Sequence, residues 1–266
     1  MWVHRFIVTC PRQHLVNVCM MLQMHLTPEK YSISISTIKF PMTQREKEII
    51  IADLSEKFGF PGVLGCIDGT HIAIIRPTDH EETFLNRKHF HSLNVLILCD
   101  SKLNIMYVDA SFGGAAHDSY VWNHCPIKSH LQRLGRNEHC WLLGDSGYAQ
   151  RPWMMTPILG AGSGTPEEYY TNLHCRVRNT VEWCIGVLKA RWRCLLAHRV
   201  LHYDPVTAVK IVNACVVLHN IANMQNAEIP EIQASDAGSE HMSQDLGGSP
   251  MSPSGVRGRC ITHLFP

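Results

Sequence analysis

The sequence carries little charge, and almost no excess of either sign. Its 266 residues hold 24 Lys and Arg against 23 Asp and Glu, a formal net charge of +1. A near-neutral chain does not coat nucleic acid over its whole surface, so any such surface must be local. No uninterrupted apolar run approaches the ~18 residues of a membrane span, and the first ten residues lack a signal-peptide pattern, so we expect no membrane partner.

The cysteines and histidines lack the spacing of a structural metal site. The 11 cysteines are odd in number and form no Cys-x-x-Cys pair, which argues against a disulfide framework and favours reduced thiols inside a cell. Among the 17 histidines, His117-Asp118 suggests a His-Asp phosphohydrolase. The other histidines such a site needs are not at a recognisable helical spacing, so we expect most imidazoles to be ordinary surface or partly buried groups.

Composition divides the chain into three parts. Residues 1–59 are expected to form a helical segment, in which Thr43 followed by Glu46 has the pattern of a capping box. Residues 60–226 alternate apolar runs with amphipathic stretches and predict a single α/β domain. Residues 227–266 are rich in Ser, Gly and Pro, and we expect a disordered tail.

The central part predicts a mixed sheet flanked by helices. Strands are expected near residues 63–75, 93–99, 105–110, 141–144 and 154–158, and helices at 117–134 (interrupted at Pro126), 167–194 and 204–224. The short polar turn at Asp100-Ser101-Lys102 makes the second and third strands a hairpin, so the sheet is not all parallel. Open α/β sheets bind ligands at the carboxyl ends of their strands, so Asp68 and Asp145 can meet if their strands are neighbours.

Two aspartates follow apolar runs in the same way, and a glutamate lies on a later helix. Asp68 and Asp145 each end an apolar run and have a glycine nearby. Glu182 borders an apolar helical stripe, where a lone charge would be costly. Its partner is either Arg178, four residues earlier on the same helix, or a metal ion shared with the two aspartates.

Residues 176–199 carry a local excess of positive charge. Six basic residues oppose one acid there, so the net charge of the segment is +5. A one-sided face beside a single acid is what a phosphate track next to a metal site would need. The candidate nucleic-acid-binding residues are Arg176, Arg178, Lys189, Arg191 and Arg193.

Several motifs together resemble a known family. The chain is similar to the PIF/Harbinger transposases, and closer to the Harbinger transposase-derived nucleases, over about residues 37–224. The motifs that carry this resemblance, in order, are Phe60-Pro61-Gly62-Val63-Leu64-Gly65-Cys66-Ile67-Asp68-Gly69-Thr70-His71-Ile72, His117-Asp118-Ser119, Leu143-Gly144-Asp145-Ser146-Gly147-Tyr148, Arg178-Asn179-Thr180-Val181-Glu182 and Val216-Val217-Leu218-His219-Asn220-Ile221.

The resemblance implies an RNase H-like fold with a DDE active site that cuts DNA. Asp68, Asp145 and Glu182 would be its catalytic residues and would bind Mg²⁺ or Mn²⁺, two ions serving an in-line phosphodiester displacement. Asp118 matches a further acidic position of the family and is either a fourth metal ligand or a helix N-cap. Cys66 should face the same side as Asp68 but serve packing, because a soft thiol is a poor ligand for either ion.

The second hypothesis is a protein that has kept the fold but not the catalysis. Trp183 replaces the arginine that usually follows the family's Val-Glu, and Thr171 replaces an asparagine. The helical segment at 1–59 is shorter than in the family, which favours a scaffold that binds protein or DNA. The resemblance also implies a nuclear protein, with the cytoplasm open as a second location, and a Myb-like partner that supplies DNA targeting and nuclear import. A homo-oligomer stays open.

Overall fold

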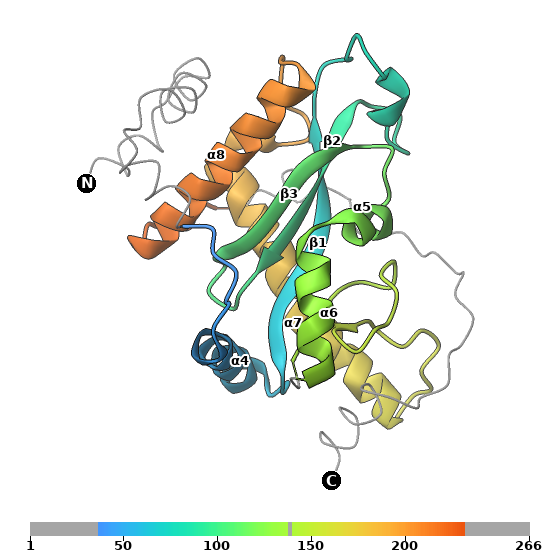
Figure 1. Cartoon of the computed structure of the whole chain (residues 1–266), viewed down its shortest axis with the longest axis vertical. Coiled ribbons are helices and arrows are strands. Elements are labelled where there is room, and N and C mark those ends of the chain that lie inside the picture. Colours follow the sequence, from blue (N-terminus) through green and yellow to red (C-terminus); the bar gives the residue numbers. More distant parts are fainter. Residues whose placement is uncertain (1–36, 138–139, 232–266) are drawn as a thin grey trace.

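A five-stranded mixed sheet forms the centre of the molecule (Figure 1). The computed structural model describes residues 37–137 and 140–231. The strand order is β3-β2-β1-β4-β5, which confirms the expected mixed sheet. The strands are β1 (Val63–Ala73), β2 (Ser92–Cys99), β3 (Ile105–Gly113), β4 (Trp141–Leu143) and β5 (Met154–Met155).

Five helices surround the sheet in the described residues. They are α4 (Gln44–Phe58), α5 (Asp118–His124), α6 (Ile127–Asn137), α7 (Pro166–Arg191) and α8 (Pro205–Met224), with single turns of 3-10 helix at Glu81–Thr83 and Arg193–Leu195. The predicted interruption at Pro126 is confirmed, since that residue lies between α5 and α6. The helix expected to reach residue 194 stops at Arg191, where Trp192 leaves helical geometry at φ −113° and ψ 76°.

The pairing pattern brings the first acidic strand beside the second. β1 pairs antiparallel with β2, and β2 antiparallel with β3, as the predicted hairpin requires. On its other side β1 pairs parallel with β4, with Cys66 opposite Leu143. β4 in turn pairs parallel with β5. The carboxyl ends of β1 and β4 therefore point the same way.

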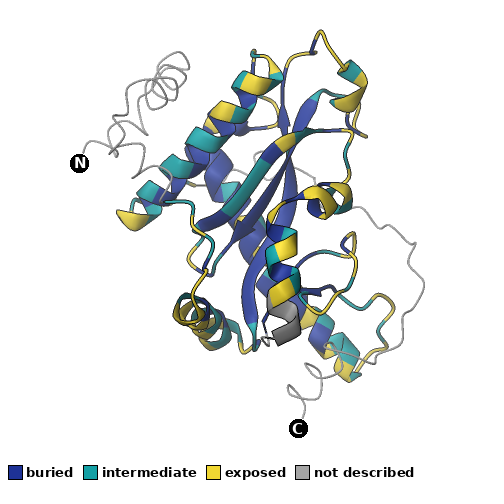
Figure 2. Cartoon of the chain, in the orientation of Figure 1, coloured by how far each residue is buried: buried dark blue, intermediate teal, exposed yellow. Residues whose placement is uncertain are grey.

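Alternating side chains of the strands build two hydrophobic cores, one on each face of the sheet. On β1, Val63 and Cys66 pack with α7 and α8, whereas Leu64 and Ile67 pack with α5 and α6. From Cys66 onward the side chains alternate with the two-residue period of a strand. Val63, three residues before Cys66, shares its face because the pairing of β1 with β4 shifts register between Val63 and Gly65. Because both faces are covered, β1 and β2 are buried along nearly their whole length (Figure 2).

Helix α4 begins and ends as its sequence predicts. The Thr43 hydroxyl accepts a hydrogen bond from the backbone N–H of Glu46, and the Glu46 carboxylate accepts one from the backbone N–H of Thr43. This reciprocal pair is the predicted capping box. At the other end Gly59 adopts φ +74°, a conformation that glycine reaches without steric cost.

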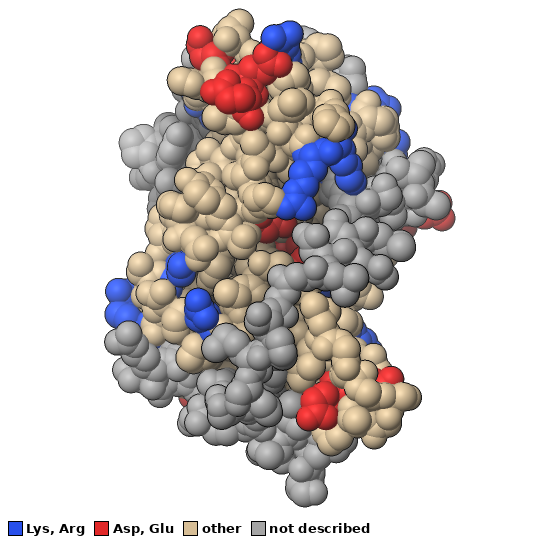
Figure 3. All heavy atoms as spheres, turned by 90° about the vertical axis from the view of Figure 1, so that its right-hand side faces the viewer, with Lys and Arg blue, Asp and Glu red and all other residues tan. Residues whose placement is uncertain are grey.

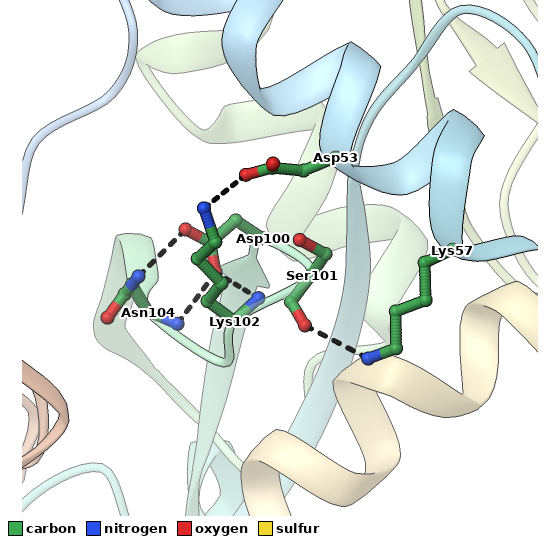
Figure 4. Close-up of polar contacts among 6 residues, drawn as sticks. All are labelled: Asp53, Lys57, Asp100, Ser101, Lys102 and Asn104. Carbon is green, nitrogen blue, oxygen red and sulfur yellow. Dashed lines mark hydrogen bonds and ion pairs between the residues drawn. The ribbon is translucent and has the colours of Figure 1, made fainter. Parts of the chain in front are cut away.

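The β2–β3 turn is held against α4 by polar contacts (Figure 4). Asp100 Oδ1 accepts hydrogen bonds from the backbone N–H groups of Lys102 and Asn104, at 2.8 and 2.9 Å. Lys102 pairs with Asp53 of α4 at 2.5 Å, and Lys57 of the same helix donates to the Ser101 carbonyl at 3.2 Å. These contacts therefore fix the turn end of the hairpin against α4.

Helix α7 is bonded both to the centre of the sheet and to its far edge. The Cys66 thiol of β1 donates to the Val177 carbonyl at 3.4 Å. At the other edge the buried His174 ring contacts the Met155 carbonyl at 3.1 Å, and the Tyr170 hydroxyl donates to the Thr156 carbonyl at 3.0 Å. One helix therefore connects β1 with the segment that follows β4.

Helix α8 is long and apolar. It is 20 residues long, and its most apolar 18-residue stretch has a mean hydropathy of 1.4, so by length and composition alone it could cross a membrane, although Lys210 interrupts it. This contrasts with the expectation from the sequence that no segment is long and apolar enough to do so. The helix packs against β3, and 44% of its most apolar stretch is buried. Its buried residues belong to the core shared with α7, as in a core helix.

Two sequence predictions fall outside the described residues. The helix expected within residues 1–36 and the disordered tail from residue 232 onward are not described by the structure. The proposed domain limits at 1–59, 60–226 and 227–266 therefore stay predictions.

Candidate functional site

Asp68 is a buried charge in the middle of β1. Its side chain is fully buried, and its Oδ1 accepts a hydrogen bond from the Gly69 N–H at 2.9 Å. Its Oδ2 lies 3.2 Å from Nη1 of Arg178 on α7. A buried carboxylate needs such a partner, because leaving it alone in the core would cost several kcal/mol. Asp68 therefore faces α7, on the same side as Cys66, as strand alternation predicts.

Asp145 lies at the end of the neighbouring parallel strand. It comes two residues after Leu143, which pairs with Cys66, just as Asp68 comes two residues after Cys66. Asp145 is half-buried, and its Oδ1 accepts a hydrogen bond from the Gly147 N–H at 2.9 Å. The condition for the two aspartates to meet, that their strands be neighbours, is confirmed.

Glu182 reaches the same place from α7. Its Oε1 lies 2.5 Å from Nη2 of Arg178, and its side chain is 28% exposed. The helical partner four residues earlier is therefore present. Arg178 is only 15% exposed and also holds Asp68, so the contact is not an ordinary surface ion pair. One guanidinium joins the strand carboxylate to the helix carboxylate.

The electrostatics of Arg178 include the third acid. Burial alone would lower the pKa of the Arg178 guanidinium, but the negative charges of Asp68, Glu182 and Asp145 outweigh it and raise that pKa above its ordinary value. All three predicted catalytic residues therefore act on one positive charge, and Arg178 is the cation that makes the cluster of acids tolerable in this structure.

Asp118 approaches from the opposite side of β1. The N-cap of α5 is His117, without a side-chain cap hydrogen bond, so the N-cap alternative for Asp118 is wrong. Asp118 Oδ1 instead accepts a hydrogen bond from Asn94 Nδ2 at 2.7 Å. It lies against Gly69, where an added Cβ would be 2.2 Å from Asp118 Oδ1. Glycine at this position allows a fourth carboxylate to lie beside the strand of Asp68.

Gly69→Ala tests what Asp118 contributes. The new methyl group would overlap the Asp118 carboxylate and displace it, whereas Asp68 faces away from this side. If Asp118 helps to bind the metal, we expect Mn²⁺ affinity measured by calorimetry to fall about tenfold, with a cost in stability of about 1–3 kcal/mol for the overpacking. Unchanged affinity in a folded variant would show that Asp118 is no ligand. Gly65→Ala, earlier on the same strand, is the control, since its Cβ would meet the Cys99 carbonyl oxygen at 2.8 Å and overpack β1 without touching an acid.

Tyr148 is a site residue that the sequence reasoning missed. Burial raises the pKa of its phenol well above the ordinary value, and the charges of Asp118, Asp68 and Asp145 raise it further. Its hydroxyl is buried and has no hydrogen-bond partner among the described residues. The only signal was its place in the Asp-Ser-Gly-Tyr motif, three residues after Asp145.

The donor set fits a hard divalent cation, although the side chains are not arranged as a formed metal site. No group of three or more His, Cys, Asp or Glu side chains within residues 37–137 and 140–231 is spaced to hold an ion. The carboxylates nonetheless offer the oxygen ligands that Mg²⁺ and Mn²⁺ prefer. The unpartnered Tyr148 hydroxyl close to them would suit a water molecule of a hydrated ion. Burial raises the pKa of Cys66 to about 12, so its thiol stays protonated and serves packing.

The predicted phosphate track does not form a continuous surface. Lys189 and Arg191 are buried, at 6% and 4% exposure, and Arg191 donates to Asn223 Oδ1 at 2.6 Å. Arg178 is engaged by the acids, which leaves Arg176 and Arg193 exposed among the five candidates. The spacing alone did not reveal that the last turn of α7 faces α8, so the expectation of an exposed one-sided face is corrected.

The two substituted family positions do not touch the acids in the contacts described. Trp183 is 49% exposed on α7. The Thr171 hydroxyl accepts a hydrogen bond from the Ile158 N–H at 3.1 Å and so fixes the loop before α7. Neither substitution removes a carboxylate from the site.

Comparison with known proteins gives the class of this fold and site. The family described as DDE superfamily endonuclease matches residues 67–220, a range that includes all four acids. The chain therefore belongs to that family, and its resemblance to the Harbinger transposase-derived nucleases is confirmed.

The alignments with individual relatives include a larger share of this chain than of each relative. The chain is 35% identical over 187 residues to the bovine protein named "Putative nuclease HARBI1" and 34% identical over 187 residues to its human counterpart; each alignment covers 70% of this chain and 53% of the relative. A plant relative, Protein ALP1-like of Arabidopsis thaliana, is 24% identical over 177 residues, 61% of this chain and 43% of that protein. The chain spans about half the length of the HARBI1 proteins it matches, and no solved structure matches it significantly.

Proposed function

We propose that this chain is a divalent-metal-dependent DNA endonuclease of the transposase-derived DDE type, with an RNase H-like fold. The observation that carries the proposal is the contact of Asp68 and Glu182 with one guanidinium, beside Asp145 on the adjacent parallel strand. Acids from two strands and one helix converge where only a positive charge can stabilise them. Membership of the DDE superfamily endonuclease family and the names of the relatives support the same function.

The residues divide the work as follows. Asp68, Asp145 and Glu182 would hold Mg²⁺ or Mn²⁺, with Asp118 as a further ligand approaching past Gly69. When bound, such ions activate the attacking water or 3′-hydroxyl and stabilise the leaving oxygen of the phosphodiester. Asp68 is fixed by the Gly69 N–H and Asp145 by the Gly147 N–H, so each presents its carboxylate in a set orientation. Arg178 neutralises Asp68 and Glu182 when no metal is bound.

The experiment that tests the proposal is plasmid nicking by the purified chain. We expect conversion of supercoiled plasmid to nicked circles in Mn²⁺, and its loss in EDTA, because the carboxylates alone cannot activate water. Calorimetric titration with Mn²⁺ accompanies it. If the folded chain neither binds Mn²⁺ nor nicks DNA in its presence, the proposed function is refuted and the non-catalytic scaffold is favoured.

The scaffold remains the second candidate function because Arg178 already neutralises the acids and no cluster in the described residues is spaced for an ion. We also propose, from the family resemblance, that the protein acts in the nucleus and depends on a Myb-like partner for targeting to DNA. Two measurements would test this dependence. The protein should co-precipitate from cells with a Myb-like protein, and its nuclear staining should be lost when that protein is depleted.

A further inference from the structure

A basic loop lies beside the acidic site, on a segment that none of the motifs above includes. It comprises Arg87, Lys88 and His89, all exposed, between β1 and β2. Figure 3 shows Lys and Arg side chains next to a recess in which acidic atoms lie. The loop contains no acid, so it contributes two fixed positive charges to its surroundings.

The loop is shaped by a buried asparagine. Asn86, 5% exposed, accepts hydrogen bonds at Oδ1 from the N–H groups of Lys88 and Phe90, at 2.9 and 3.2 Å. Its Nδ2 donates to Ser92 Oγ at 2.9 Å. The backbone closes through Asn86 N–H to the Phe90 carbonyl at 3.1 Å, with His89 at φ +61°. These contacts hold the two basic side chains on a defined tip rather than a floppy one, which lowers the entropy cost of binding a ligand.

Two acids, Glu81 and Glu82, precede the loop. Glu82, the nearer in sequence, is 78% exposed and lies 3.9 Å from Nδ1 of His80, whereas Glu81 is held in two closer pairs. Glu81 pairs with Arg76 at 2.5 Å and with His91 at 3.0 Å. Arg76 and His91 therefore hold the Glu81 carboxylate at the foot of the loop, and in the contacts described it does not pair with Arg87 or Lys88.

Arg87 connects the loop to the site. Its Nη2 contacts the His117 ring, with Nε2 at 3.2 Å. His117 is the residue before Asp118, and Asp118 lies against Gly69, next to Asp68. The guanidinium therefore contacts the residue next to Asp118, and its fork of N–H donors matches the oxygens of a phosphate.

We propose that Arg87 and Lys88 bind backbone phosphates of the nucleic-acid strand that is cut at Asp68, Asp145 and Glu182. This inference rests on the proposed nuclease function. Without a metal ion the acids repel a polyanion, so positive charge beside the site would help to hold the phosphates of a strand that lies over them. The predicted track on α7 does not supply this charge, because Lys189 and Arg191 are buried.

The test is DNA binding by the full chain in EDTA, measured by fluorescence anisotropy with a short duplex at several salt concentrations. For the double variant Arg87→Gln/Lys88→Gln we expect the slope of log K against log salt to become less negative by about 2, since each phosphate contact contributes about 0.9. We expect affinity at low salt to fall roughly tenfold. The charge-matched control is Lys57→Gln/Lys102→Gln, which removes two positive charges at the β2–β3 turn (Figure 4).

The outcomes separate this inference from the function on which it rests. A wild-type slope in the loop variant, an equal loss in the control, or no DNA binding by the wild-type chain would each overturn the inference. The expected slope change in a wild-type chain that does not nick DNA in Mn²⁺ would uphold phosphate binding and refute the nuclease. Thermal unfolding of both double variants shows whether either has lost its fold. If the loop double variant does not fold, the single Arg87→Gln and Lys88→Gln variants are measured in its place.

Discussion

Asp145→Asn is expected to reduce Mn²⁺-dependent nicking by about a thousandfold, which corresponds to about 4 kcal/mol of transition-state stabilisation. Asparagine keeps the size of the side chain and can still accept the hydrogen bond from the Gly147 N–H. It lacks the negative charge that makes a carboxylate a strong ligand for a divalent ion. Initial rates of plasmid nicking measure the effect, and calorimetry with Mn²⁺ shows whether metal binding is lost with it.

Asp109→Asn is a closely matched control for this variant. Asp109 is half-buried on β3, and its Oδ1 accepts a hydrogen bond from the N–H of Ser111, two residues later, at 3.0 Å. It therefore has the local geometry of Asp145 at a position without a proposed role, and the control should retain full activity. Nicking that survives in Asp145→Asn would eliminate the proposed mechanism.

Arg178→Met is expected to destabilise the metal-free protein by about 3–5 kcal/mol, because it leaves the buried Asp68 carboxylate without its partner. Methionine fills much of the volume of the arginine stem, so the loss reports the charge more than a cavity. Urea unfolding in EDTA measures it. A metal ion offers the acids a replacement cation, so we expect Mn²⁺ to raise the free energy of unfolding more in the variant than in the wild-type chain.

Arg176→Met, two residues earlier on α7, is the matched control. Arg176 is exposed and donates to the Phe58 carbonyl at 3.1 Å without an acidic partner in the contacts described. We expect its removal to cost about 1 kcal/mol or less and to leave the response to Mn²⁺ unchanged. If the two variants lose equal stability, or if Mn²⁺ stabilises Arg178→Met no more than wild type, then Arg178 is not the cation that a metal replaces.

The parts of this architecture that rest on local signals could be predicted from the sequence. The capping box at Thr43, the hairpin turn at Asp100 and the break at Pro126 depend on residues close together along the chain. The adjacency of the strands of Asp68 and Asp145 could be stated only as a condition. Sequence spacing gives strand direction and length, but the neighbour of each strand is decided by the packing of the whole sheet.

The parts that failed depend on contacts between distant residues. Arg191 is buried against α8, where it donates to Asn223, and Lys189 is buried against β1, where it donates to the His71 carbonyl at 3.3 Å. A count of charges along one helix contains no information about that packing. Asp118 resembles an N-cap because it lies at the start of a helical stretch. Its carboxylate instead accepts a hydrogen bond from Asn94, 24 residues away in sequence. Arg178 was considered as a partner of Glu182 alone. Its second bond spans 110 residues of sequence, which no local pattern could reveal.

Helix α7 is bonded to both β1 and the segment after β4, and this affects how mutations could change the spacing of the acids. The separation of the acid-bearing segments is set by interior contacts such as Tyr170 to Thr156 and Cys66 to Val177, and not by a surface loop. A methyl group added or removed beneath that helix would therefore change the gap between the acids while leaving every one of them in place. Divergent copies could lose or regain their chemistry through the core alone.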